Sequence, residues 1–345
     1  MTEIYRQIID HPSAWTNKAI NGKEGLTYKM TEAQLDGIDA ALKKTRHLGI
    51  QEATRKDFSA PVLDKMLAEL FDILQNGRGA VIIQGCTPAR YTPEDFERIY
   101  WGFGTHWGTA VTQSAKGDKI GRVTFTPVGP ENPTNRAYRS NEELTLHTDL
   151  NELVGLMCVQ NAQSGGYSQL ASSAAVHNVI LQTRPELLPA LYEGYYYASR
   201  EAALTAQPVT PYKIPVFSYT GGKLSCIYTG GFMEAAAVKL GVEMPADLVE
   251  AITYLKQVAA REDIHANFML QPGEISMFNN YTVMHSRTAF EDSAEKKRYL
   301  MRLWLNLPQG GRPVVEPYRL EANFYTNVHF KKDAEPLREH VSIGA

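Results

Sequence analysis

The chain has 345 residues, of which 43% are hydrophobic, so it is long enough to bury a large core without disulfide or metal support. Its 35 basic and 38 acidic side chains give a formal charge of −3, which gives no sign of a nucleic-acid or anionic-membrane partner. The three cysteines are far apart and form no disulfide or zinc pattern, and we expect neither a secretory leader nor a membrane span. These features predict a soluble, cytoplasmic protein.

Four segments open the predicted order of elements. Residues 61–77 place apolar side chains at helical spacing, with Ser59 as a candidate N-cap and a glycine at the end. The apolar run 79–86 predicts a short buried strand, and 92–104 predicts a helix with a capping box and an acidic first turn. Residues 108–143 are rich in Gly, Pro, Thr and Asn, which predicts a long loop of the kind that is usually functional or disordered.

The second half of the chain mixes strands with two helical segments. Residues 153–160 predict a buried strand, 172–194 a helical segment interrupted near a proline, 207–232 hairpins, and 244–263 an amphipathic helix. Further strand-like segments follow at 266–271, 274–280, 281–285 and 298–307.

Many short strands with a few helices outside them predict an α+β protein with a mainly β core, either a β-sandwich or a jelly-roll, and surrounding helices. No linker divides the chain. We therefore expect a single domain, with a core at about 78–307, a helical N-terminal segment at about 1–77 and a tail at about 308–345.

The stretch LTLHTDLNELVG, residues 144–155, places His147 and Asp149 two positions apart among leucines. Side chains two apart on a strand point to the same face, so this imidazole and carboxylate are expected to converge. Two such ligands do not hold iron securely, and a third ligand is required. Two histidines and one carboxylate leave open coordination positions and are typical of non-haem Fe(II) oxygenases.

His285 is the strongest candidate for the third ligand, because it ends a predicted strand that follows a Pro-Gly turn. His106 lies near aromatic residues and could line a pocket instead. The remaining histidines lie in helical or polar segments, at His11, His47, His177, His265, His329 and His340.

The strand RYLMRLWLN supports this interpretation. Arg298, Leu300, Arg302 and Trp304 share one face, and two arginines on an apolar strand are costly unless anions pair with them. The Cα atoms of the two arginines are roughly 13 Å apart at four residues' separation, so their side chains could bind the two ends of a short dicarboxylate. The alternative is that Asp or Glu residues on a neighbouring strand pair with them.

Four motifs in this order and spacing resemble the taurine dioxygenase and clavaminate synthase-like Fe(II)/2-oxoglutarate oxygenases over roughly residues 78–307. They are HTD at 147–149, SGGYSQL at 164–170, PGEISMFNNYTVMHSRTAF at 272–290 and RYLMR at 298–302. The resemblance implies a double-stranded β-helix (jelly-roll) fold. It also implies Fe(II), 2-oxoglutarate and O2 as cofactors and co-substrates.

The resemblance further implies a role for each matching residue. His147, Asp149 and His285 would bind iron, while Ser168 and Arg298 would bind the distal carboxylate of 2-oxoglutarate. Arg302 would lie nearer the metal, at the C1 carboxylate or the substrate. Halogenating relatives lack the carboxylate ligand. Asp149 therefore favours hydroxylation, desaturation or ring closure of a small molecule, such as an amino-acid derivative or a natural-product intermediate.

Substrate contacts are expected from the loop before HTD and from side chains that point toward the metal. The candidates are Tyr138, Arg139, Asn141, His106 and Arg287. The alternatives to an oxygenase are a non-catalytic protein on the same barrel and a cupin-type metal-binding isomerase or hydrolase. We expect no nucleic-acid or membrane partner, and the exposed helices of such a fold can support a homo-oligomer.

Overall fold

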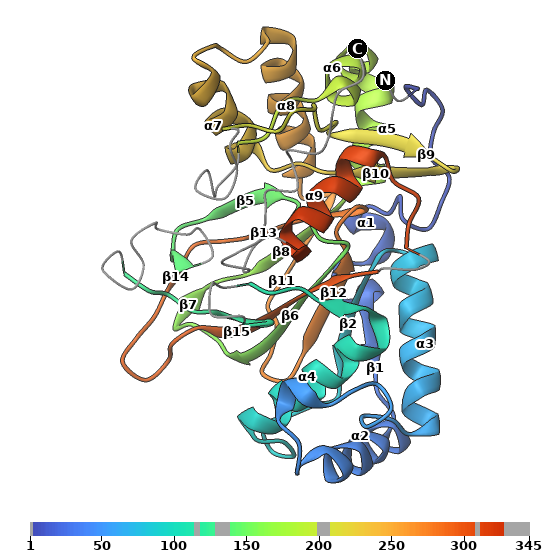
Figure 1. Cartoon of the computed structure of the whole chain (residues 1–345), viewed down its shortest axis with the longest axis vertical. Helices are drawn as coiled ribbons and strands as arrows, with labels where there is room; N and C mark the ends of the chain where they lie inside the picture. The colour runs from blue at the N-terminus through green and yellow to red at the C-terminus, as the bar shows by residue number, and fades with distance from the viewer. Residues whose placement is uncertain (1–2, 114–117, 128–138, 199–207, 308–310, 328–345) are drawn as a thin grey trace.

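The computed structural model describes residues 3–113, 118–127, 139–198, 208–307 and 311–327, and it combines helices with two main sheets (Figure 1). The larger sheet has seven strands in the order β1-β2-β12-β6-β15-β3, with β4 also pairing with β15. These strands are β1 (Thr27–Lys29), β2 (Ala80–Gln84), β3 (Thr109–Ala110), β4 (Ile120–Val123), β6 (Leu153–Gln160), β12 (Ile275–Asn279) and β15 (Tyr299–Asn306).

The smaller sheet has four strands in the order β11-β8-β13-β5. These are β5 (Leu144–His147), β8 (Ser168–Ser172), β11 (His265–Phe268) and β13 (Val283–Arg287). Neighbouring strands of this sheet are antiparallel, whereas in the larger sheet β1 runs parallel to β2. The mixed helix and sheet architecture expected from the sequence is therefore confirmed.

The space between the two sheets is filled by side chains from both. Val154, Phe278 and Leu300 of the larger sheet belong to one apolar cluster with Leu170 and Val283 of the smaller sheet. The alternation along β15 separates this cluster from the opposite face of the sheet, as the sequence pattern predicts. The inner face of β15 therefore carries side chains into the region between the sheets.

Three N-terminal helices cover the other face of the larger sheet, and Figure 1 shows them at its lower right. They are α2 (Glu32–Thr45), α3 (Pro61–Asn76) and α4 (Pro93–Trp107). The predicted helices at 61–77 and 92–104 are confirmed, and Thr92 caps α4 through the predicted capping box. The prediction that Ser59 caps α3 is wrong, because Ala60 is the N-cap and the Ser59 hydroxyl donates to Asp64 instead.

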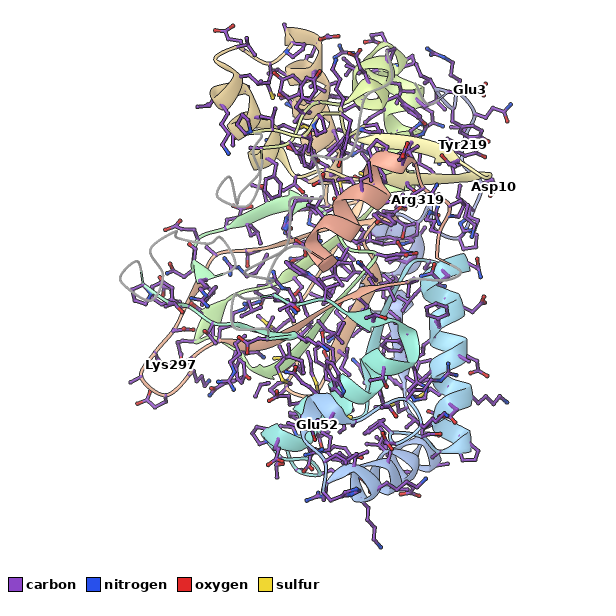
Figure 2. The ribbon with its side chains drawn as sticks, in the orientation of Figure 1. Glu3, Asp10, Glu52, Tyr219, Lys297 and Arg319 are labelled. Atoms are coloured by element: carbon purple, nitrogen blue, oxygen red, sulfur yellow. The ribbon has the colours of Figure 1, made fainter. Side chains whose placement is uncertain are left out.

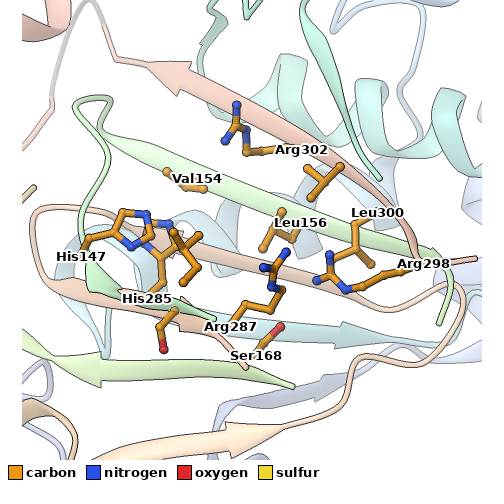
Figure 3. A pocket seen from close by; sticks show the side chains of 12 residues that line it. His147, Val154, Leu156, Ser168, His285, Arg287, Arg298, Leu300 and Arg302 are labelled. Carbon is orange, nitrogen blue, oxygen red and sulfur yellow. The ribbon is translucent and has the colours of Figure 1, made fainter. Parts of the chain in front are cut away.

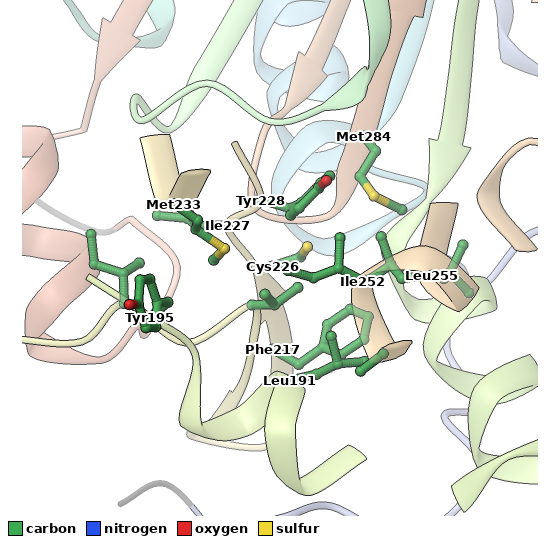
Figure 4. Packing of buried hydrophobic residues seen from close by; sticks show 14 of the residues in the cluster. Leu191, Tyr195, Phe217, Cys226, Ile227, Tyr228, Met233, Ile252, Leu255 and Met284 are labelled. Carbon is green, nitrogen blue, oxygen red and sulfur yellow. The ribbon is translucent and has the colours of Figure 1, made fainter. Parts of the chain in front are cut away.

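A second group of helices packs around the β9–β10 hairpin at the top of Figure 1, where their apolar side chains form the cluster drawn in Figure 4. The helices of this group are α5 (Ser173–Thr183), α6 (Leu188–Glu193), α7 (Gly230–Leu240), α8 (Ala246–Ala259) and α9 (Glu316–Asn327), and the hairpin consists of β9 (Phe217–Thr220) and β10 (Lys223–Cys226).

The remaining short elements of the described residues are α1 (Asn17–Ile20), the strands β7 (Ser164–Gly165) and β14 (Phe290–Glu291), and the 3-10 helices η1 (Glu24–Leu26), η2 (Ile50–Glu52) and η4 (Pro185–Leu187). No helix of the described residues is long and apolar enough to cross a membrane.

Two segments differ from their predicted structure. The expected loop at 108–143 contains strands β3 and β4, which both pair with β15. The N-terminal segment, expected to be helical, contributes β1 to the larger sheet. In both segments the strands are very short and take their hydrogen bonds from distant parts of the chain, so local sequence patterns do not reveal them.

A buried carboxylate connects the segment before α9 to the HTD region. Glu152 accepts a hydrogen bond of 2.8 Å from the Arg312 backbone N–H, and both side chains are buried. Burial raises the pKa of Glu152 from 4.5 to about 7, although Arg312 opposes the shift. The folded protein therefore binds an additional proton between these two values. The resulting stabilisation is complete below about pH 4.5 and is lost as the pH rises through about 7.

We expect the Glu152→Gln variant to lose this pH dependence. Glutamine keeps the shape and the acceptor oxygen but carries no charge, so the variant should gain stability relative to the wild type as the pH rises from about 5 to about 8. The gain is on the order of 1–3 kcal/mol. Urea unfolding at both pH values measures it, and a free energy of unfolding that changes equally with pH in both proteins would contradict the assignment.

Candidate metal centre

The HTD segment lies at the end of a strand rather than within one. β5 ends at His147, so Thr148 and Asp149 lie just beyond the strand. Thr148 and Tyr228 exchange hydrogen bonds of 2.7 and 2.8 Å, and the Asp149 N–H donates to Asn280 Oδ1 at 2.9 Å. The expectation that His147 and Asp149 lie on one strand is therefore wrong. Their expected proximity is found, and these hydrogen bonds hold the irregular segment that carries the Asp149 carboxylate beside the imidazole.

His285 completes a cluster with these two residues. It lies within β13, directly opposite His147 on β5, and the two ring centroids are 4.3 Å apart. His285 Nε2 lies 3.7 Å from Asp149 Oδ2, and the three candidate ligand atoms all lie within 4.8 Å of one another. His147 Nδ1 lies 2.7 Å from the Thr145 carbonyl. A proton on Nδ1 satisfies this contact and leaves Nε2 as the free ligand atom.

The protonation states of the cluster suit a metal. Burial, together with the charge of the neighbouring His147, lowers the pKa of His285 to about 3. Burial alone would raise the pKa of Asp149, but His285, Arg302 and His147, with a hydrogen bond from Trp304, together lower it below its usual value. At neutral pH the cluster therefore offers a neutral imidazole and a carboxylate, the forms that bind a metal.

Trp304 and Arg302 hold the Asp149 carboxylate from the larger sheet. The Trp304 indole N–H donates to Asp149 Oδ2 at 2.8 Å, and the Arg302 guanidinium lies 3.9 Å from the centre of the Trp304 ring. Arg302 Nε in turn donates to Gln113 Oε1 at 2.8 Å. This chain of contacts fixes one oxygen of Asp149 and so fixes the direction in which the other points.

We expect the Trp304→Phe variant to weaken Fe(II) binding by about 10- to 100-fold, the usual cost of losing a hydrogen bond to a metal ligand. Phenylalanine keeps the ring beneath Arg302 but cannot donate to Asp149. Anaerobic Fe(II) titration measures the change. Trp101→Phe is the matched control, since Trp101 donates its indole N–H to the Ala53 carbonyl within the N-terminal helical layer. Equal Fe(II) affinity in the two variants would contradict the role of Trp304.

A cavity extends from the two histidines between the sheets (Figure 3). The larger sheet supplies an apolar wall and two arginines, and the smaller sheet supplies the histidines, two serines and a third arginine. The lining residues are Val123, Leu144, His147, Val154, Leu156, Ser168, His285, Ser286, Arg287, Arg298, Leu300 and Arg302.

The end of the cavity away from the histidines is positively charged. The chain passes from the exposed turn at Lys297 (Figure 2) to Arg298, which is 4% exposed. Arg298 Nη1 is buried and has no hydrogen-bond partner in the described residues. Ser168, on the facing sheet, is also buried and lines the same cavity. Gly166 has a φ of +77°, and a Cβ there would lie only 3.0 Å from Arg298 Nε, so glycine leaves room for this arginine.

The residues predicted to contact the substrate lie at different places relative to the cavity. Arg287 lines the cavity, whereas Arg139 and Asn141 are described but are not among its lining residues. Tyr138 lies outside the described residues. The structure places His106 elsewhere: its side chain is 3% exposed, and Nε2 lies 2.8 Å from the Phe58 carbonyl in the helical layer.

The sequence pattern of the family described as Taurine catabolism dioxygenase TauD, TfdA family matches residues 42–304, which is more than half of the chain. The chain therefore belongs to the TauD, TfdA family. The family is one of dioxygenases, so this TauD/TfdA-family protein is an oxidoreductase.

Two curated relatives resemble the TauD/TfdA-family protein over most of its length. FR-33289 synthase from Streptomyces rubellomurinus is 28% identical over 318 residues, covering 90% of this chain and 94% of the relative. The taurine hydroxylase-like protein SAT17 from Stachybotrys chartarum is 28% identical over 309 residues, covering 84% and 77% of the two chains.

Solved structures share the fold. Asparagine oxygenase in complex with Fe(II), 3-hydroxyasparagine and succinate superimposes with a TM-score of 0.64 at 15% identity, covering 81% of this chain and 93% of that one. The non-haem iron oxygenase OrfP with Fe and alpha-ketoglutaric acid gives a TM-score of 0.61 at 13% identity, covering 81% and 94%. At these identities the likeness shows the fold of the TauD/TfdA-family protein.

Sequence reasoning missed two residues of this centre. Trp304 lies on the predicted inner face of its strand, two residues after Arg302, and that position was its only signal. Gln113 comes from the segment expected to be a loop, and its amide bonds both the Arg302 side chain and the Arg302 carbonyl. Gln113 had no signal, because its role depends on a contact between residues 189 positions apart.

Proposed function

We propose that the chain is an Fe(II)- and 2-oxoglutarate-dependent oxygenase that hydroxylates, desaturates or cyclises a small molecule. The observation that carries this proposal is a cavity lined by buried arginines and by both histidines of a two-histidine, one-carboxylate cluster. A cupin-type isomerase or hydrolase needs a metal cluster but has no use for these arginines. A non-catalytic protein has no use for either feature.

His147, Asp149 and His285 would hold the iron. Two imidazoles and a carboxylate form a donor set that leaves coordination positions open on one side, as Fe(II) oxygenases require. When bound, the iron would supply the activation of O2 that couples decarboxylation of 2-oxoglutarate to oxidation of the substrate. Trp304 would keep Asp149 in one orientation through its hydrogen bond of 2.8 Å.

Ser168 and Arg298 would bind the distal carboxylate of 2-oxoglutarate. The unpartnered Arg298 Nη1 supports this assignment, because a buried guanidinium without an anion is costly and a carboxylate would satisfy it through paired hydrogen bonds. Arg302 would lie at the metal end, beside the C1 carboxylate or the substrate. Its position against the ring of Trp304, which donates to Asp149, supports this assignment.

We infer a double-stranded β-helix arrangement for the two facing sheets, because the inner faces of both line one cavity and the family's structures share the fold. For the substrate we propose a small polar molecule such as an amino-acid derivative. Two of the solved relatives are complexes with 3-hydroxyasparagine and with L-Arg. Arg139 and Asn141, in the segment before β5, remain candidates for contacts with it.

The test is formation of succinate from 2-oxoglutarate by the Fe(II)-loaded protein with a panel of amino acids and their derivatives. We expect succinate under air and none under anaerobic conditions, with a mass gain of one oxygen in the substrate that is hydroxylated. Succinate formation that does not depend on O2, or none with any substrate, would refute the proposed function.

A further inference from the structure

A third arginine, Arg287, lines the cavity in addition to Arg298 and Arg302. Arg287 follows His285 by two residues on β13 and lies directly opposite Ser168 on β8. Side chains of directly opposed residues lie on the same face of a sheet, so Arg287 and Ser168 share the face toward the cavity. Arg287 is 5% exposed.

The hydrogen bonds of Arg287 do not satisfy all the donors of its guanidinium group in the described residues. Nη1 donates to the Ser140 carbonyl at 3.0 Å, Nη2 donates to the Glu142 carbonyl, and the buried Nε has no partner in the described residues. No ion pair joins Arg287 or Arg298 to a carboxylate within the part of the chain that the structure describes. Two backbone carbonyls satisfy donors but do not neutralise a charge.

Arg287 and Arg298 lie together although they repel each other. Their guanidinium carbons lie 4.8 and 5.2 Å from the centre of the same Phe290 ring, and Figure 3 shows the two groups near each other above Ser168. Burial, together with the charge of Arg287, lowers the pKa of Arg298 to about 10. Two buried cations beside one ring are costly without an anion, and an anion that accepts hydrogen bonds from both would remove this cost.

We propose that Arg287 is a second arginine for the distal carboxylate of 2-oxoglutarate, which binds between Arg287, Arg298 and Ser168. This assignment rests on the proposed function and takes the place of the sequence-based expectation that Arg287 contacts the substrate. A carboxylate has two oxygens with about four acceptor positions, enough for both guanidinium groups and a hydroxyl. Arg287 thereby also links the co-substrate to the backbone of Ser140 and Glu142, just before β5.

The test compares two 2-oxo acids that share the chelating end but differ at the other. 2-Oxopentanoate lacks the distal carboxylate of 2-oxoglutarate. Binding of each to the anaerobic Fe(II)-loaded protein is measured by calorimetry for the wild type, Arg287→Met and Arg287→Lys. We expect Arg287→Met to raise the Kd for 2-oxoglutarate about tenfold or more, and to leave the Kd for 2-oxopentanoate close to that of the wild type. Arg287→Lys keeps the charge but cannot form two parallel hydrogen bonds to a carboxylate. Its preference for 2-oxoglutarate over 2-oxopentanoate should therefore lie between those of the wild type and Arg287→Met.

The matched control is Arg122→Met, which removes an exposed arginine from β4 of the larger sheet and should change neither constant. An equal loss of affinity for both acids in Arg287→Met, or no loss for either, would overturn the assignment, since a purely structural arginine does not distinguish them. A wild-type protein that binds neither acid in the presence of Fe(II) would overturn the proposed function itself.

Discussion

The Asp149→Ala variant is expected to lose O2-dependent succinate formation. Asp149 is the only carboxylate among the three residues of the cluster, and no other acidic residue of the described chain completes such a group with His147 and His285. Two neutral imidazoles hold Fe(II) far more weakly than two imidazoles with an anion. We expect Fe(II) affinity to fall by more than about 100-fold, measured by anaerobic titration alongside the succinate assay.

A second variant separates the charge of Asp149 from its shape. Asp149→Asn keeps an oxygen that accepts from Trp304, but it supplies no negative charge, so it should bind Fe(II) nearly as poorly as alanine. Asp57→Ala removes an exposed carboxylate that only bonds Thr54, and it serves as the control with unchanged activity. Full turnover in Asp149→Ala would show that the cluster is not the metal site.

The Arg298→Met variant is expected to lose affinity for 2-oxoglutarate and to gain stability. Arg298 is 4% exposed and has no anionic partner among the described residues, so replacing it with an apolar side chain of similar length removes a desolvation cost. The same change removes the main cation at that end of the cavity. We expect the Tm of the ligand-free variant to equal or exceed that of the wild type, and its KM for 2-oxoglutarate to rise by about 100-fold.

Two measurements make this expectation specific. Addition of 2-oxoglutarate to protein already loaded with a redox-inert divalent metal should raise the Tm of the wild type by more than that of Arg298→Met, because stabilisation by a ligand falls as its affinity falls. Arg122→Met, on the exposed face of β4, should behave as the wild type. A ligand-induced shift of equal size in Arg298→Met would remove Arg298 from the co-substrate site.

Sequence reasoning succeeded where a pattern repeats along one strand. The alternation in β15 placed Arg298, Leu300 and Arg302 on the inner face, and all three line the cavity. The spacing of His147 and Asp149 correctly predicted that their side chains lie together, although Asp149 lies beyond the end of the strand. These predictions depend on neighbours within two to four residues, for which the chain's geometry is fixed.

Sequence reasoning failed where the outcome depends on distant contacts or on an ambiguous turn signal. His106 lies near aromatic residues in the sequence, but the packing of α4 turns its ring toward Phe58 and away from the cavity. The helix α7 begins at Gly230, within the segment 207–232 that was predicted to form hairpins, because the alanine-rich run after the glycines favours a helix. The sequence around His106 and the sequence around Gly230 do not reveal which distant parts of the chain pack against them.

The site draws its groups from two different sheets. The metal cluster and Ser168 come from β5, β8, β13 and the residues just after β5, whereas Arg298 and Arg302 come from β15 and the residue before it. In the proposed complex, one small dicarboxylate anchored at both ends would add a cross-link between two layers that the apolar cluster and the Trp304–Asp149 hydrogen bond already join. Amide hydrogen exchange in β13 and β15 should then slow together when iron and 2-oxoglutarate bind. Binding of the co-substrate would thereby raise the free energy needed to separate the two sheets.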